Sequence, residues 1–151
     1  MKRLQLTAAA ICLAAAPMLA FAADPMVGTW ALDAAKSKNL EPMSPKTEII
    51  TATAAGYKFR EISEMHPGAR QASDVDVVLD GKPHTLDIQG SKLTQTFTRK
   101  DARTIEISSL GDGQPLGTAT VALSPDGKTL SITESGPPGT SAPLVRVYDK
   151  Q

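Results

Sequence analysis

The sequence predicts an all-β fold, a single antiparallel up-and-down barrel of about 8–10 strands. Threonine, valine and isoleucine alternate with polar residues along most of the chain, which is the pattern of strands with one buried face. Turn residues such as Asp80-Gly81 recur at short intervals between these segments. Helix has one weak candidate, residues 33–38, where Asp33 is a possible N-cap and Pro42 and Pro45 follow closely.

Alternation and turn signals divide the chain into about ten strand regions. The first contains Gly28 and Trp30, the single tryptophan of the chain; the glycine lets the strand bend, and the indole is expected to fill the barrel floor. The regions are residues 26–32, 46–53, 57–64, 72–79, 83–88, 92–99, 103–109, 115–123, 128–134 and 144–149.

The first 22 residues have the features of a secretory signal peptide. Met1-Lys2-Arg3 is positively charged, residues 4–16 are mostly apolar, and Ala20-Phe21-Ala22 is a small-x-small cleavage site. The apolar run is interrupted by Pro17 and is short for a bilayer span. We therefore expect a signal peptide over residues 1–22, a barrel domain over 23–151, no stable membrane span, and a periplasmic or secreted protein.

The mature chain is expected to be free of cysteine and close to neutral. Cys12, the one cysteine, lies inside the signal region, so disulfides, thiolate nucleophiles and cysteine metal sites are not expected. The chain has 16 basic and 16 acidic residues, and removal of Lys2 and Arg3 leaves a net charge of −2. Without a basic patch, nucleic acid is not an expected partner.

No residue pattern indicates a catalytic or metal site. Asp74, Asp76 and Asp80 resemble a charged outer face more than a calcium loop, which needs further oxygen ligands and a glycine where valines stand. His66 and His84 lie beside prolines, have no recognisable acid partner, and are expected in exposed positions. There is no Gly-x-Ser-x-Gly nucleophile elbow. We expect no enzyme, no cofactor and no bound metal.

Both ends of the chain resemble known lipocalin-like proteins. Gly28-Thr29-Trp30-Ala31-Leu32-Asp33-Ala34-Ala35-Lys36-Ser37-Lys38 resembles the opening G-T-W-x-L-(N/D)-x-x-K-S-K of a family of small exported bacterial proteins with no assigned activity. The ending Val147-Tyr148-Asp149-Lys150-Gln151 is similar to that family too. The resemblance implies a calycin-type barrel, the architecture of lipocalins and fatty-acid-binding proteins.

Arg146-Val147-Tyr148 resembles the Arg-x-Tyr pair with which fatty-acid-binding proteins hold a carboxylate. The resemblance implies that Arg146 and Tyr148 contact a ligand head group. Tyr57, Phe59 and Phe97 are the candidate apolar lining. One departure is that residues 33–45 are too short and too rich in proline for the helix-turn-helix lid of those proteins.

Arg146 also has a structural interpretation. An alternating strand most simply directs its valines, here Val145 and Val147, into the core. Arg146 would then lie on the outside or rim, over the indole of Trp30, and with Gly28 would seal the barrel where the first and last strands meet. We expect this arrangement, with an inward Arg146 as the alternative.

These features predict a lipocalin-like protein that binds a small hydrophobic or amphiphilic ligand inside the barrel. Two alternatives stay open. One is a filled barrel that acts as an interaction or inhibitor module through its loops. The other is a cofactor-independent isomerase or cyclase, which requires a buried acid or base beside an interior cavity.

Overall fold

The computed structural model describes residues 24–137, 139 and 141–151, so the predicted signal peptide lies outside the described residues. The described residues form ten strands, and each overlaps one of the predicted regions, with ends that differ by a few residues. They are β1 (Gly28–Leu32), β2 (Thr47–Thr53), β3 (Gly56–His66), β4 (Ala69–Val78), β5 (Pro83–Ile88), β6 (Ser91–Asp101), β7 (Thr104–Gly111), β8 (Gln114–Leu123), β9 (Thr129–Ser135) and β10 (Leu144–Lys150).

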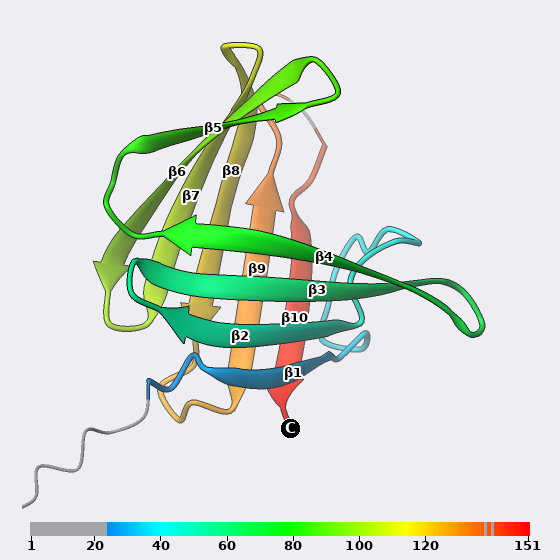
Figure 1. The fold of residues 1–151 in the computed structure, drawn as a ribbon. Helices are drawn as coiled ribbons and strands as arrows, with labels where there is room; N and C mark the ends of the chain where they lie inside the picture. The colour runs from blue at the N-terminus through cyan, green and yellow to red at the C-terminus, as the bar shows by residue number, and fades with distance from the viewer. Residues whose placement is uncertain (1–23, 138, 140) are drawn as a thin grey trace, which may run out of the picture.

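All ten strands belong to one antiparallel sheet with the order β4-β3-β2-β1-β10-β9-β8-β7-β6-β5. The first and last strands pair with each other, Trp30 opposite Lys150 and Leu32 opposite Tyr148. Strands β1–β4 therefore cross in front of β6–β10 and form a second wall facing them (Figure 1).

The sheet curls into a barrel without closing completely. Its two edge strands are β4 and β5, and in the described part of the chain no ladder joins them. The barrel is therefore open at this one junction. Charged residues along β4, including Asp74 and Asp76, are typical of an edge strand that avoids pairing with another chain.

The segment between β1 and β2 contains turns where a helix was a weak candidate. The Asp33 side chain accepts hydrogen bonds from the backbone N–H groups of Ala35 and Lys36, so it caps a turn instead of starting a helix. Lys38 then pairs with Val145 in an isolated bridge. This pairing holds the segment against the edge of β10, which is why helix propensity does not decide its conformation.

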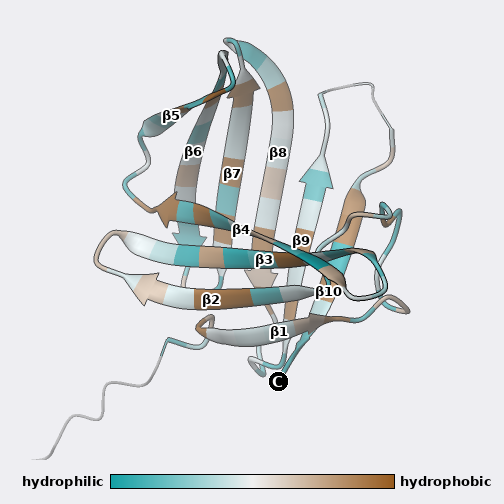
Figure 2. Ribbon diagram, turned by 45° about the vertical axis from the view of Figure 1, so that its right-hand side comes forward, coloured by the Kyte–Doolittle hydropathy of each residue, from teal (hydrophilic) through white to brown (hydrophobic). Residues whose placement is uncertain are grey.

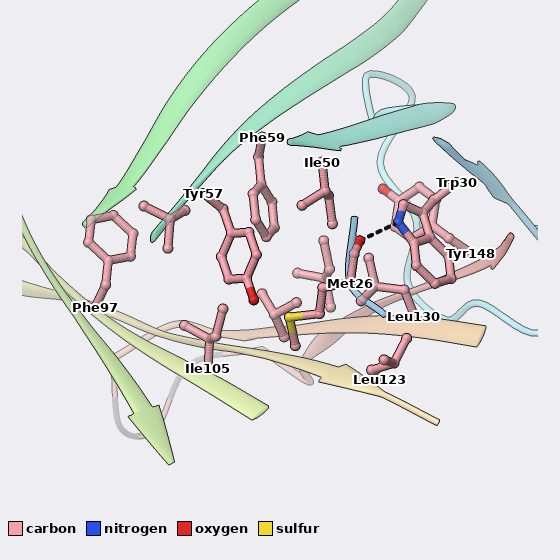
Figure 3. Close-up of a cluster of buried hydrophobic side chains, with 13 residues drawn as sticks. Met26, Trp30, Ile50, Tyr57, Phe59, Phe97, Ile105, Leu123, Leu130 and Tyr148 are labelled. Atoms are coloured by element: carbon pink, nitrogen blue, oxygen red, sulfur yellow. Dashed lines mark hydrogen bonds between the residues drawn. The ribbon is translucent and has the colours of Figure 1, made fainter. Parts of the chain in front are cut away.

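Alternation places one face of each strand inside the barrel. Brown and teal bands follow one another along β2, β3 and β4 in Figure 2. Ile50, Tyr57 and Phe59 project from one wall toward Ile105 and Leu130 of the other (Figure 3). The core that results contains Met26, Trp30, Ile50, Tyr57, Phe59, Val77, Phe97, Ile105, Val121, Leu123, Leu130, Ile132 and Tyr148.

A bulge in β8 brings the backbones of β8 and β9 unusually close. The register of β7 and β8 shifts between Ser109 and Leu110, and Gly117 has a φ of 141°. A Cβ atom at Gly117 would lie 2.1 Å from the Ser135 carbonyl oxygen. Only glycine fits this position without moving β9.

Gly117→Ala should therefore lower the free energy of unfolding by about 2–4 kcal/mol, because it combines backbone strain with overpacking. Gly68→Ala is the matched control: Gly68 also has a positive φ, 85°, but a Cβ there meets nothing within 4 Å, so the expected loss is about 1 kcal/mol. Urea unfolding of the two variants measures the difference. Equal losses would contradict the close backbone approach.

Candidate ligand-binding cavity

A partly open cavity of about 750 Å³ lies between the two walls of the barrel. Both walls contribute apolar side chains, including Phe59 and Val77 from one and Phe97, Ile107 and Ile132 from the other. Its volume falls in the range of small-molecule sites, roughly 300–1,000 Å³. The barrel interior is therefore incompletely filled by its own side chains.

Three of the five predicted contact residues line this cavity. Phe59, Phe97 and Arg146 belong to its wall, whereas Tyr57 and Tyr148 do not. Both tyrosines are buried, with 2% and 0% of their surface exposed, and their hydroxyl groups bond to the protein itself. Phe59 and Phe97 therefore lie on the cavity wall and the two tyrosines lie outside it, and the ligand contacts themselves stay predictions.

Tyr57 contacts the N-terminal segment that precedes β1. Arg99 Nη2 donates to the Tyr57 hydroxyl at 2.6 Å, and that hydroxyl donates to Asp24. The Arg99 guanidinium also lies 5.3 Å from the Tyr57 ring centroid. Burial, followed by the nearby Asp24, raises the pKa of Tyr57. These contacts join the N-terminal segment to β3 and β6.

Arg146 points into the barrel, contrary to the expectation that the valines of its strand would. Arg146 is only 6% exposed, while Val145 and Val147 are half-buried on the outer face. Beyond the end of β1, residues 33–38 continue the pairing along the edge of β10: the Val145 backbone bonds with the Lys38 backbone, and the Val147 backbone bonds with Asp33 and Ser37. The Arg146 guanidinium donates to Glu134 of β9.

The cation over Trp30 is Lys150, not Arg146. Lys150 Nζ lies 4.9 Å from the Trp30 ring centroid and donates to Pro25 O at 2.8 Å. The register explains the correction, because Trp30 is opposite Lys150 whereas Arg146 is opposite Ile132. At Gly28 a Cβ atom would lie 3.1 Å from Lys150 Cε, so Gly28 and Trp30 do belong to the strand closure.

Tyr148 and a buried glutamate form a polar pair deep in the barrel. The Tyr148 hydroxyl oxygen lies 3.2 Å from both Pro45 O and Glu48 Oε1. The phenol has one proton, so both bonds are best made when it donates to Pro45 O and a protonated Glu48 carboxyl donates to the phenol. Glu48 is 0% exposed, which favours the same protonated form.

The surroundings of Glu48 also favour its protonated form by raising its pKa. Burial, and next the charge of Glu61 directly opposite on β3, raise the pKa of Glu48 to about 8, against the lowering effect of Arg146. Burial also raises the pKa of Tyr148. At neutral pH the interior therefore holds a largely neutral Glu48 behind the charged groups of the cavity wall.

Three glutamates of this region were missed by sequence reasoning. Glu61 and Glu134 line the cavity, and Glu48 lies behind them. The signal that could have found them is strand parity, because residues two positions apart in a strand share a face. Glu48 shares its face with Ile50, Glu61 with Phe59, and Glu134 with Ile132, and these three apolar residues face inward. Glutamate on an apolar face was passed over because isolated charges are rare in cores.

The aspartates and His84 lie on the outside. Asp74 and Asp76 are exposed and form ion pairs with Arg60 and Lys58, as expected of a solvent-facing strand. His84, against expectation, has an acid partner, since its Nε2 lies 2.9 Å from Asp80 Oδ1. The hydrogen bond to His84 lowers the pKa of Asp80.

In the described residues no group of three or more potential ligands is arranged to hold a metal ion, and no helix is long and apolar enough to span a bilayer.

The cavity thus combines two kinds of surface. Apolar side chains such as Phe59, Phe97 and Ile107 can cover a hydrocarbon chain or ring, and polar groups including Glu61 and the Arg146–Glu134 ion pair belong to the same wall. A few converging polar groups in an apolar pocket are what orients an amphiphilic ligand.

Glu48→Gln should make the protein's stability less sensitive to pH. A carboxyl with a native pKa of about 8 and an unfolded value near 4.5 contributes full stability below pH 4.5 and loses it as the pH rises to 8. The slope is about 1.4 kcal/mol per pH unit, so the advantage of the E48Q variant should grow by about 2–4 kcal/mol between pH 5 and 8. Urea unfolding at several pH values measures it. The exposed Glu106→Gln is the control, and parallel profiles for E48Q and wild type would contradict the protonated carboxyl.

Comparisons with known proteins rest on the fold alone. No protein-family model matches the chain, and no curated protein matches it in sequence. Among solved structures, the "REP1-NXSQ fatty acid transporter" is similar with a TM-score of 0.62 and 13% identity, over 85% of this chain and 98% of that one.

Two further neighbours are "As-p18, an extracellular fatty acid binding protein", with a TM-score of 0.55, 17% identity and coverage of 85% and 97%, and fatty-acid-binding protein 1 of Echinococcus granulosus, with a TM-score of 0.55, 16% identity and coverage of 83% and 97%. The chain therefore has the ten-stranded fold of fatty-acid-binding proteins, within the lipocalin-like architecture.

Proposed function

We propose that this protein is an exported carrier that binds a small hydrophobic or amphiphilic ligand inside its barrel. The observation that carries the proposal is the cavity of about 750 Å³ with an apolar wall and a polar end at Arg146. The fold neighbours titled as fatty acid transporter and fatty-acid-binding proteins support it by analogy. The mature chain, from about residue 23, would act in the periplasm or outside the cell, as its signal-like first residues suggest.

Within this proposal the side chains have separate roles. Phe59 and Phe97 cover the apolar part of the ligand, and Arg146 contacts its polar end. Tyr148 acts indirectly, because its hydroxyl holds Glu48 and so shapes the polar end. The filled-barrel interaction module finds no support in a barrel with a cavity of this size.

An enzymatic role has one observation in its favour. Glu48 is a buried carboxyl whose raised pKa, about 8, suits a general acid or base near neutral pH. It is not among the residues that line the cavity, so a ligand reaches it only past Glu61 and Arg146. The binding role is therefore the better supported of the two.

Filling the cavity tests the binding role. Ala119 lines it on β8, and Ala119→Phe should weaken binding of dodecanol, a neutral amphiphile, by about tenfold or more, since loss of one decade needs only about 1.4 kcal/mol. Competition with the neutral dye Nile red measures the affinity.

Ala122→Phe is the matched control, because Ala122 lies on the same strand and has the opposite parity. It should bind dodecanol like the wild type. Equal affinities for the two variants, or absence of binding to the wild type, would contradict a ligand site in the barrel.

A further inference from the structure

The charged side chains on the cavity wall are predominantly acidic. Glu41, Glu61 and Glu134 line the cavity together with one basic residue, Arg146. Arg146 and Glu134 form an ion pair in which the Arg146 side chain is 8% and the Glu134 side chain 43% exposed. This pair is neutral as a unit, so the carboxylates of Glu41 and Glu61 determine the sign of the remaining charge.

Glu61 is the more enclosed of these two carboxylates. It is half-buried on the inner face of β3, and its carboxylate accepts a long hydrogen bond of 3.4 Å from the Ser73 hydroxyl. Directly opposite on β2 stands the fully buried Glu48. An ionised Glu61 disfavours ionisation of Glu48, so at neutral pH the negative charge of this facing pair lies on Glu61, where a positively charged group in the cavity can meet it.

Two buried polar atoms beside this acidic surface have no partner among the described residues: Arg146 Nε and Glu48 Oε2. Arg146 is 6% exposed and belongs to the cavity wall. A buried donor without a partner costs about 1–3 kcal/mol, and a ligand that enters the cavity can supply an acceptor to Arg146 Nε, whereas Glu48 is not among the residues of the cavity wall. Nε requires an acceptor and Oε2 requires a donor.

A fatty acid fits these requirements poorly. Its carboxylate can accept from Arg146 Nε, but it brings a further negative charge to a cavity that already contains Glu41 and Glu61, and the Arg146 charge is already matched by Glu134. A protonated amine with a neighbouring hydroxyl or carbonyl group fits better, since its N–H groups donate to the Glu61 carboxylate and its oxygen accepts from Arg146 Nε.

We propose that the cavity selects amphiphiles with a positively charged nitrogen in the head group, with Glu61 as the residue that recognises the charge. The tail lies along the apolar wall and the head group lies between Glu61 and Arg146. This inference rests on the proposed function, since it names the ligand class of the same cavity.

A set of three ligands with the same twelve-carbon chain tests the inference: dodecylamine, dodecanol and dodecanoate. Their affinities for the full mature protein are measured by competition with Nile red at pH 7, below the concentrations at which the ligands form micelles. We expect the amine to bind best, the alcohol less well and the carboxylate least, with a difference of roughly tenfold or more between amine and carboxylate.

Two charge-matched variants assign the effect to the cavity. Glu61→Gln should abolish the preference for the amine over the alcohol, measured as the ratio of the two affinities for the same variant. Glu106→Gln removes the same charge from the outer face, where Glu106 pairs with Lys100 at 3.1 Å, and should retain the preference. Thermal unfolding of both variants verifies that they are folded.

Each of the other outcomes overturns a defined part of the proposal. A carboxylate that binds as tightly as the amine overturns the cationic ligand class while the binding function stands. An amine preference that survives in Glu61→Gln overturns the role of Glu61. If wild-type protein binds none of the three compounds, the proposed function itself fails, and the alcohol is the ligand that separates this result from the first.

Discussion

The pairing of the first strand with the last is the constraint on which the rest of the structure depends. Trp30 lies opposite Lys150 and Leu32 opposite Tyr148, and residues 33–38 continue alongside β10. Without this junction the meander would be two separate sheets, each with an apolar face in water. With it, β1–β4 turn across β6–β10 (Figure 1), and their apolar faces share one core. Lys150 over the Trp30 ring covers the junction from the side of the C-terminus.

The same closure explains why a polar cluster can exist in the interior. Tyr148 follows Arg146 on the inward face of β10. The pairing of β10 with β1, and of β1 with β2, places Tyr148 beside Glu48. An interior carboxyl of this kind costs stability at neutral pH. Together with the bulge at Gly117, which also lines the cavity, it shows that local rules are broken around the cavity, as is typical of functional regions.

Much of the fold could be predicted because strand alternation and turn chemistry are local. All ten strands fall where valine, threonine and turn residues indicate them, and Phe59 and Phe97 line the cavity as proposed. The site was less predictable. Arg146 was expected outside because a valine-rich strand face is usually the buried one, yet on β10 the buried face carries Arg146 and Tyr148. Tyr57 and Tyr148 were expected at the ligand, but their hydroxyl groups bind Asp24 and Glu48.

The sequence by itself determined the all-β class, the number and position of the strands, and the place of Gly28 and Trp30 in the strand closure, because these follow from the two-residue period of a strand and from turn residues. Only the tertiary structure decided which face of β10 points inward, that β4 and β5 remain unpaired edges, and that Glu48, Glu61 and Arg146 meet in one interior. Parity identifies residues that share a face, but which face is buried depends on what the rest of the chain packs against it.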